Sequence, residues 1–188
     1  AVAACETAAR AEPLSPVVSF YYAGALYNGG DFVRAVAECE RALRFAPDAP
    51  LSFWIKAMSL AGLRRFDEAL PVAHRFCDLL PGAILPRGTL GMTLALAGET
   101  SRALEVAAEL EALRERQYVQ ASSIADIYCG LRDADSTVAW LERAFAEREG
   151  LLPRVFTQYP YFWLYDDPRF LALFRQMKLG DTYPGLRR

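Results

Sequence analysis

Apolar and small residues recur along most of the chain at steps of three and four, with charged residues between them. Two neighbouring stretches show this pattern most clearly, PVVSFYYAGALYN and DFVRAVAECERALRF. The spacing places the apolar side chains on one face of an α-helix, and no run alternates long enough to indicate a strand. Pro47, which cannot continue a helical hydrogen-bond ladder, follows the second stretch and marks its end. The pattern therefore predicts pairs of amphipathic helices.

The helix pattern repeats with a period of 34 residues. One column of small residues recurs in the second helix of each pair, another recurs in the first helix, and an apolar column lies three residues after the latter. Antiparallel helices approach closely only where side chains are short, so the small columns predict the contact within each pair. A single pair cannot bury its apolar face, and stacking of neighbours supplies a continuous core. The columns are Ala1, Ala35, Ala69, Ala103 and Thr137; Ala23, Ala57, Gly91 and Ala125; and Leu26, Leu60, Leu94 and Tyr128.

The turn sequence NGGD, Asn28 to Asp31, is compatible with three structures when taken alone. A β-hairpin turn needs strands on both sides, and the flanks have helical spacing. A phosphate-binding loop needs a preceding strand and a following Lys-Ser/Thr pair, and the sequence has neither. We therefore predict a turn between two helices, with Gly30 at positive φ and Asp31 capping the next helix. The position of Gly30 is held in the other repeats by Arg64, Gly98 and Arg132.

The phase of the columns divides the chain into repeats and a different C-terminal segment. Because Ala1 is in phase with Ala35, the chain is expected to begin in the second helix of a truncated repeat. The fold class is therefore all-α, a solenoid of antiparallel helix pairs with about four repeats, a leading half repeat and a C-terminal capping helix. The predicted parts are the half repeat 1–13, the repeats 16–47, 50–81, 84–115 and 118–149, and the aromatic-rich capping segment 151–188 with a terminal helix opened by Asp167 and Pro168.

Two roles are open for the aromatic residues of the capping segment. The end of a solenoid exposes apolar surface, and a terminal element is needed to cover it. Alternatively, the PYFWLY stretch occupies the groove of the array as an internal peptide, or offers itself to a partner. The residues concerned are Tyr159, Tyr161, Phe162, Trp163, Phe170 and Phe174.

Residues 1–149 resemble the tetratricopeptide repeat family. Pairs of helices, a period of about 34, small residues at the close contact and a proline ending each pair are its pattern. The third and fourth units have Glu115 and Glu149 in place of that proline. The family's tryptophan in the first helix is replaced by Ser19, Phe53, Arg87 and Ala121.

The segment from Tyr118 to Leu179 carries a second resemblance. Its motifs WLERAF and DDPRFLALFRQM, in that order, are similar to the C-terminal end of tetratricopeptide modules in bacterial multidomain regulators. In those proteins the module follows a nucleotide cyclase, a protein kinase or a winged-helix domain, sometimes across a membrane. The resemblance implies a sensory or docking module of a larger bacterial signalling protein, cytoplasmic, or periplasmic if the parent carries an upstream transmembrane segment.

Composition removes several partner classes. A net charge of −2, a pI near 5.5 and the absence of a dense basic run give no electrostatic footprint for nucleic acid. No window of about 18 apolar residues predicts a membrane span. The four cysteines lie far apart and there is one histidine, so zinc-ligand spacing is absent and buried reduced thiols are expected. Cys5 lies 34 residues before Cys39, which makes it a packing residue rather than a lipid anchor.

No constellation of residues predicts catalysis. His74 is the only histidine, and the repeat pattern brings no cysteine or serine near it. Asp166 and Asp167 form a possible carboxylate pair, but a helix cap explains the second and solvation the first. We therefore expect no enzyme activity, no cofactor and no metal site.

The resemblance implies that the first helices line a concave groove. Members of the family that hold a C-terminal carboxylate use a clamp of lysine and asparagine there, and Asn28 is the only such residue at these positions. The remaining surface is mostly apolar, and it suits an apolar or amphipathic segment of a protein or peptide, including another domain of the parent chain. The predicted groove residues are Phe20, Tyr27, Asn28, Trp54, Met58, Met92, Leu96, Ser122 and Asp126; Trp54 and Met92 are equally compatible with a place in the core between repeats.

Two functions follow from this groove. The first is a non-catalytic protein-protein interaction module. The second is an architectural or self-association domain, in which the groove is filled by the chain's own C-terminal segment or by a second copy.

Overall fold

The computed structural model describes residues 2–178, and the chain is helical throughout that range, with ten α-helices and two 3₁₀ helices. Ala1 of the small-residue column and residues 179–188 of the predicted capping segment lie outside the described residues. The α-helices are α1 (Val2–Ala11), α2 (Pro16–Asn28), α3 (Phe32–Phe45), α4 (Pro50–Gly62), α5 (Phe66–Leu79), α6 (Ile84–Leu96), α7 (Thr100–Leu113), α8 (Ala121–Gly130), α9 (Ala134–Ala146) and α10 (Pro168–Gln176), and the 3₁₀ helices are η1 (Leu152–Thr157) and η2 (Tyr159–Asp166).

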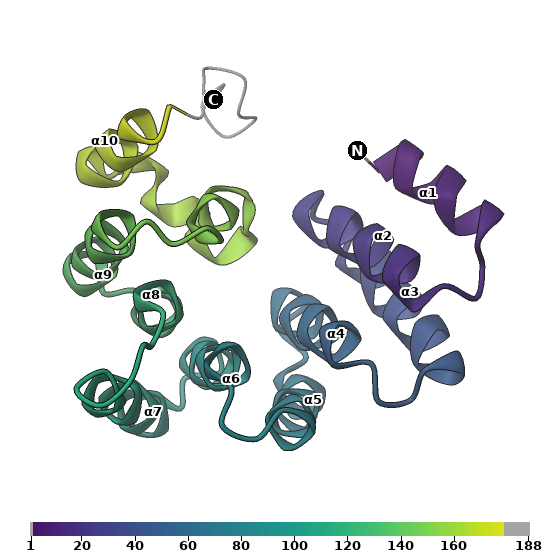
Figure 1. The fold of residues 1–188 in the computed structure, drawn as a ribbon, viewed down its shortest axis with the longest axis horizontal. Helices are drawn as coiled ribbons and strands as arrows, with labels where there is room; N and C mark the ends of the chain where they lie inside the picture. Colours follow the sequence, from purple (N-terminus) through teal and green to yellow (C-terminus); the bar gives the residue numbers. More distant parts are fainter. Residues whose placement is uncertain (1, 179–188) are drawn as a thin grey trace.

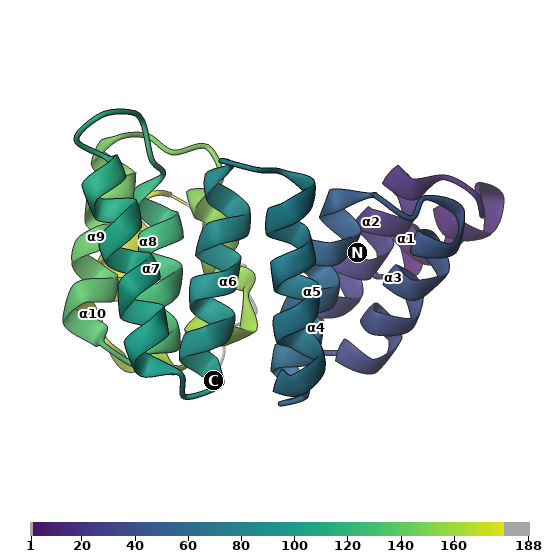
Figure 2. The same ribbon diagram turned by 90° about the horizontal axis from the view of Figure 1, so that it is seen from below.

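The helices pack in the order of the chain. Each helix from α1 to α9 contacts the next, and α2, α4, α6 and α8 also contact one another in succession. The result is an arc with α4, α6 and α8 on its inner side and α5, α7 and α9 on its outer side (Figure 1). Seen from below, α4 to α9 stand side by side with their axes roughly aligned (Figure 2). This arrangement agrees with the predicted all-α solenoid.

The turns inside the helix pairs have one backbone geometry that recurs every 34 residues. At each of them, one residue at positive φ donates its N–H to the carbonyl three residues back, and the next N–H reaches the carbonyl five back. This is the Schellman ending of a helix, which favours glycine. NGGD is therefore a turn between helices, as predicted, and Asp31 caps α3 by accepting from the Arg34 N–H at 3.2 Å. The φ values are 80° at Gly30, 59° at Arg64, 85° at Gly98 and 63° at Arg132.

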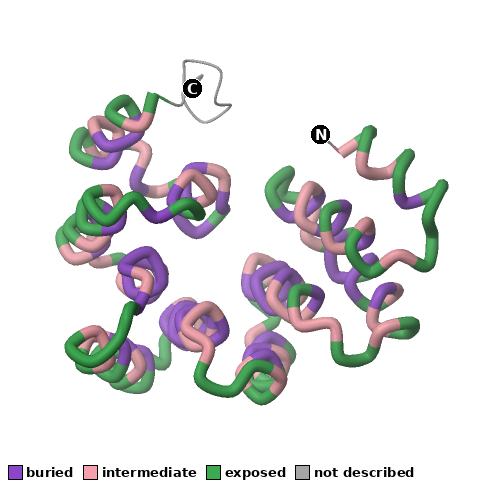
Figure 3. Tube along the Cα trace, viewed as in Figure 1, coloured by how far each residue is buried: buried purple, intermediate pink, exposed green. Residues whose placement is uncertain are grey.

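The small-residue columns lie at helix contacts, and the buried positions follow the facing sides of the helices (Figure 3). Ala35, Ala69 and Ala103 have no exposed surface. The closest approach joins α6 and α8, where a Cβ built on Gly88 would lie 2.9 Å from the backbone oxygen of Ser123. Short residues at these positions therefore determine how near the neighbouring helices can come.

A buried glutamate takes over at the end of the last helix pair, where the sequence lacks the terminal proline. The Glu149 carboxylate accepts hydrogen bonds from the backbone N–H groups of Ala121 and Ser122, in the first turn of α8. The first N–H groups of a helix have no partner within the helix, and a carboxylate is favourable there. Glu149 thus ties the end of the repeat to its beginning.

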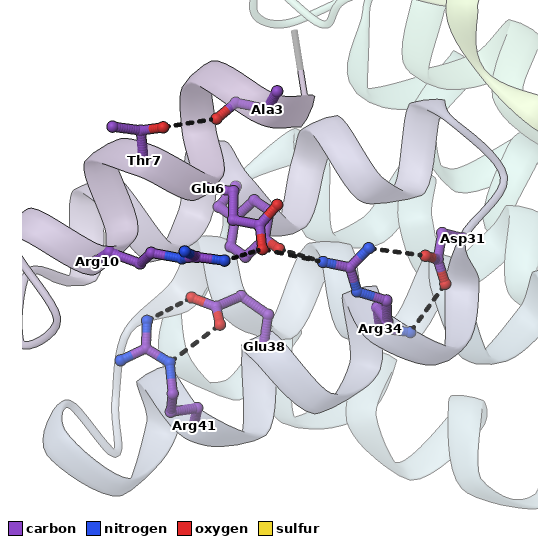
Figure 4. A network of polar contacts seen from close by, with 9 residues as sticks. Ala3, Glu6, Thr7, Arg10, Asp31, Arg34, Glu38 and Arg41 are labelled. Carbon is purple, nitrogen blue, oxygen red and sulfur yellow. Dashed lines mark hydrogen bonds and ion pairs between the residues drawn. The ribbon is translucent and has the colours of Figure 1, made fainter.

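At the N-terminal end, ionic contacts join α1 to α3 (Figure 4). Arg34 pairs with Asp31 at 3.4 Å and with Glu6 at 3.8 Å, and Glu6 also accepts from Arg10 at 3.0 Å. The side chains of these residues are about a third or more exposed. This network lies at the surface and links the leading helix to the first complete pair.

The C-terminal segment divides into two parts with different places. Helix α10 begins at Pro168, is capped by Asp167 as predicted, and contacts α9 and η2. Helices η1 and η2 turn back to the inner side of the arc, where η2 contacts α8 (Figure 1). Rings of Phe156, Phe170 and Phe174 lie about 5 Å apart and hold the two parts together. One part therefore covers the end of the array, and the other enters its inner face.

Candidate interaction site

The predicted groove residues divide by burial. Phe20 and Trp54 are half-buried and Asn28 is exposed, and all three line a common cavity at the N-terminal part of the inner face. Met58 and Met92 are buried in the core between repeats, the alternative that the sequence left open for Met92. Leu96 is half-buried and lines a separate cavity of about 480 Å³ at the turn side of α6 and α8. Tyr27, Ser122 and Asp126 are buried as well.

The common cavity, which we call the aromatic cavity, has a volume of about 320 Å³. One wall comes from α2 and α4, where the rings of Phe20 and Trp54 stack with centroids 6.3 Å apart and Tyr21 lies 5.3 Å from Phe20. Tyr21 is 63% exposed, so this wall opens to solvent. The lining residues are Phe20, Tyr21, Gly24, Ala25, Tyr27, Asn28, Trp54, Ile55, Arg154, Thr157 and Gln158.

The opposite wall comes from η1, on the C-terminal segment. Arg154, Thr157 and Gln158 line this side. The Arg154 guanidinium carbon lies 6.0 Å from the centre of the Trp54 ring, close enough for a cation–π contact. A second bridge across the arc is made by Tyr159, whose ring meets that of Phe32 edge-on at 5.2 Å. The cavity is therefore built from both ends of the chain.

A buried polar network anchors the C-terminal segment to α8. The Asp126 carboxylate accepts from the Tyr161 hydroxyl at 2.6 Å and from Arg154 Nη2 at 2.7 Å. Arg154 Nη1 also donates to Gln158 Oε1 at 2.8 Å, and the Cys129 thiol donates to the Pro160 carbonyl at 3.2 Å. The Asp126 and Arg154 side chains are 6% and 14% exposed. A charge pair this far from water requires its partners, because an unpaired buried charge is costly.

Burial changes the acid–base behaviour of the groups around this network. It raises the pKa of the Tyr161 hydroxyl well above its ordinary value, and the negative charge of Asp126 adds to the effect. Burial likewise raises the pKa of Tyr27, with the same carboxylate as the second cause. It also raises the pKa of the Cys129 thiol. These groups all stay protonated at neutral pH, so they are hydrogen-bond donors rather than nucleophiles or bases.

Two polar atoms beside the aromatic cavity have no partner. Within residues 2–178, neither the Tyr27 hydroxyl nor Arg154 Nε makes a hydrogen bond, although both atoms are buried. Both residues line the cavity. Most buried polar groups in proteins are hydrogen-bonded, so each exception needs an explanation.

The sequence analysis missed one whole wall of the cavity. It placed no cation at the predicted groove, yet Arg154 enters from the C-terminal segment, together with Thr157 and Gln158. One signal was present: Arg154 is the only charged residue from Leu151 to Tyr165. A lone charge in an apolar and aromatic stretch has to find a partner when it is buried. The sequence contains no indication that the partner is Asp126.

The residues weighed for catalysis are in ordinary structural settings. His74 is exposed on α5, and Asp167 accepts from the Arg169 side chain at 2.7 Å while capping α10. The described residues contain no group of histidine, cysteine and carboxylate side chains arranged to hold a metal. The four cysteines are free; two are buried as predicted, Cys39 and Cys129, whereas Cys5 and Cys77 are only half-buried.

Comparison with known proteins identified no relative. Neither the models of protein families nor the sequences of curated proteins match this chain. None of the helices within residues 2–178 combines the length and the apolar character needed to cross a bilayer.

Proposed function

We propose that this chain is a non-catalytic protein-protein interaction module of the tetratricopeptide repeat type. It binds an apolar or amphipathic segment at the aromatic cavity, and the segment belongs to another protein or to another domain of the parent chain. The parent is a bacterial signalling or regulatory protein, and the module works in the cytoplasm, or in the periplasm where a transmembrane segment precedes it. Nucleic acid, membrane and cofactors have no part in this function.

One observation carries the proposal, the open aromatic wall of Phe20, Tyr21 and Trp54 beside a peptide that already occupies the inner face. Three aromatic side chains meet at one cavity, and Tyr21 is 63% exposed. Aromatic residues in such a place supply large apolar area at low entropic cost, and they are typical of the anchors of protein interfaces. The chain's own segment 152–166 occupies the rest of the inner face, which supports a groove that accepts peptides.

A selection from displayed random peptides, followed by affinity measurement, tests this function. We expect selected peptides with apolar anchors spaced as on one face of a helix, and we expect Tyr21→Glu to weaken their binding at least tenfold. Phe45→Glu is the matched control, because Phe45 is an aromatic residue on α3 with 56% exposure and does not line the cavity. Peptides that ignore Tyr21→Glu, or that lose as much affinity with Phe45→Glu, contradict the proposal.

The second candidate is an architectural domain whose groove is filled from within. The network of Asp126, Arg154 and Tyr161 favours it, because these buried contacts hold the C-terminal segment firmly on α8. In that case the peptide selection yields no binder, and light scattering shows a monomer at all concentrations. A concentration-dependent dimer that Tyr21→Glu disrupts instead identifies a second copy as the occupant of the cavity.

A further inference from the structure

The cavity walls and the buried atoms beside the cavity ask for different chemistry. Phe20 and Trp54 present apolar ring surface, whereas the Tyr27 hydroxyl and Arg154 Nε are donors without an acceptor among the described residues. A buried donor that finds no partner costs about 1–3 kcal/mol, more when it carries charge. The site is therefore incomplete as it stands, and an oxygen atom that accepts from these donors completes it.

An ordered water alone does not use the space. The cavity has a volume of about 320 Å³, whereas one water occupies roughly 30 Å³ of liquid. Cavities from about 300 Å³ upward are in the range that binds small molecules or side chains. The size fits one large apolar side chain together with the polar group that precedes or follows it.

The charges near the cavity select a neutral acceptor. Arg154 is the only charged residue that lines it, and the Asp126 carboxylate at 2.7 Å already neutralises that charge. A carboxylate ligand would leave one uncompensated negative charge in a site away from water, which is expensive. A peptide carbonyl or a side-chain amide accepts the same hydrogen bonds without that cost.

We propose that the aromatic cavity binds a neutral stretch of peptide, with one apolar or aromatic side chain between Phe20 and Trp54 and a carbonyl oxygen that accepts from the Tyr27 hydroxyl and Arg154 Nε. This inference rests on the proposed function and adds the chemistry of the partner. The chain's own segment supplies a parallel a few residues away, since the Pro160 carbonyl accepts from the Cys129 thiol on α8. The inner face thus already holds one peptide carbonyl.

Small probes test the proposal in the full chain by NMR titration. N-acetyl-phenylalaninamide carries an aromatic side chain and neutral carbonyl groups, N-acetyl-phenylalanine adds a carboxylate, and toluene has the ring alone. Tyr27→Phe removes only the hydroxyl. Tyr22→Phe is the matched control, because Tyr22 is also largely buried on α2 but its hydroxyl already accepts from Arg34 and it does not line the cavity.

We expect the amide to bind most tightly, with shifts centred on Phe20, Tyr21 and Trp54. Tyr27→Phe should weaken the amide roughly three- to tenfold, the effect of one hydrogen bond, and leave toluene unchanged. Tyr22→Phe should leave both unchanged.

Three results would overturn the inference, and they separate it from the proposed function. If toluene binds as tightly as the amide and Tyr27→Phe changes neither, water satisfies the donors and the apolar site alone stands. If the carboxylate probe binds more tightly than the amide, the acceptor is not neutral. If no probe gives a saturable shift at the cavity, the proposed groove itself fails.

Discussion

At the N-terminal end of the array, Glu6 and Arg34 stand 3.8 Å apart with 36% and 51% of their side chains exposed, whereas Asp126 and Arg154, on α8 and the C-terminal segment, are 2.7 Å apart with 6% and 14% exposed. The first pair joins neighbouring helices at the surface (Figure 4). The second joins residues 28 apart in the chain on the inner face of the arc. The same ionic chemistry is therefore used in water at one end and away from water at the other.

The difference shows where the molecule depends on a specific contact. Exposed ion pairs contribute little, because water solvates the separated charges almost as well. A buried pair gains little by existing, but loss of one partner leaves a charge that nothing compensates. We therefore expect the C-terminal half to respond sharply to single substitutions that the N-terminal half tolerates.

The largest effect is expected for Asp126→Ala. It leaves the Arg154 charge buried and takes the acceptor from the Tyr161 hydroxyl, so the free energy of unfolding should fall by about 3–5 kcal/mol in a urea titration. The pair Asp126→Leu with Arg154→Met removes both charges and should recover most of that loss. A loss below about 1 kcal/mol for Asp126→Ala would mean that the network is solvated and the contrast between the two ends is wrong.

Alkaline unfolding is expected to report the buried tyrosines. The pKa of Tyr27 and of Tyr161 is raised by burial, so both stay protonated in the fold above pH 10, where the unfolded chain releases these protons. The unfolded state then binds fewer protons, and stability falls as the pH rises, by up to about 1.4 kcal/mol per pH unit for each tyrosine. Tyr27→Phe should make the decline between pH 10 and 11 less steep while leaving stability at pH 7 similar. An unchanged slope would argue against burial of that hydroxyl.

Two glycine substitutions compare the packing of the two halves. Gly88→Ala forces a Cβ to 2.9 Å from the Ser123 backbone oxygen, and overpacking of this kind costs about 1–3 kcal/mol, against a gain of about 1 kcal/mol in helix propensity. Gly24→Ala on α2 meets nothing within 4 Å, so it should stabilise by up to about 1 kcal/mol. Thermal unfolding of both variants should move the midpoint in opposite directions. Equal shifts would contradict the closer packing of α6 on α8.

The smallest effect is expected for Glu6→Gln. It removes the surface pairs with Arg10 and Arg34, and the unfolding free energy should change by less than about 0.5 kcal/mol. The same measurement in high salt should change the difference little. A loss above about 1 kcal/mol would show that the N-terminal network fixes α1, and the two ends would then differ less than their exposure indicates.

The repeat could be predicted from the sequence in detail. The expected repeat 16–47 contains α2 and α3, and the positions 30, 64, 98 and 132 all take positive φ although two of them are arginine. This agreement has a local cause, because helix periodicity, proline and the residue after a helix act within a few positions of one another. Asp31 and Asp167 as caps belong to the same class of local signal.

The candidate site was predicted only in part. Phe20, Asn28 and Trp54 line the aromatic cavity, but Met58 and Met92 belong to the core and Leu96 lines another cavity. Stepping along a repeat identifies which helix face points inward, and it does not say how much of that face the next repeat covers. Burial of a given side chain depends on the curvature of the whole array.

The sequence by itself determined the helix pairs, their period and the separate character of the C-terminal segment, because these follow from patterns within one repeat. Only the tertiary structure decided that η1 and η2 lie on the inner face, that Arg154 meets Asp126 on α8, and that Glu149 caps the same helix. These contacts join residues about 28 positions apart, outside the reach of any local pattern. Their physical cause is the arc itself, which leaves an inner face that the chain's own aromatic segment can reach and fill.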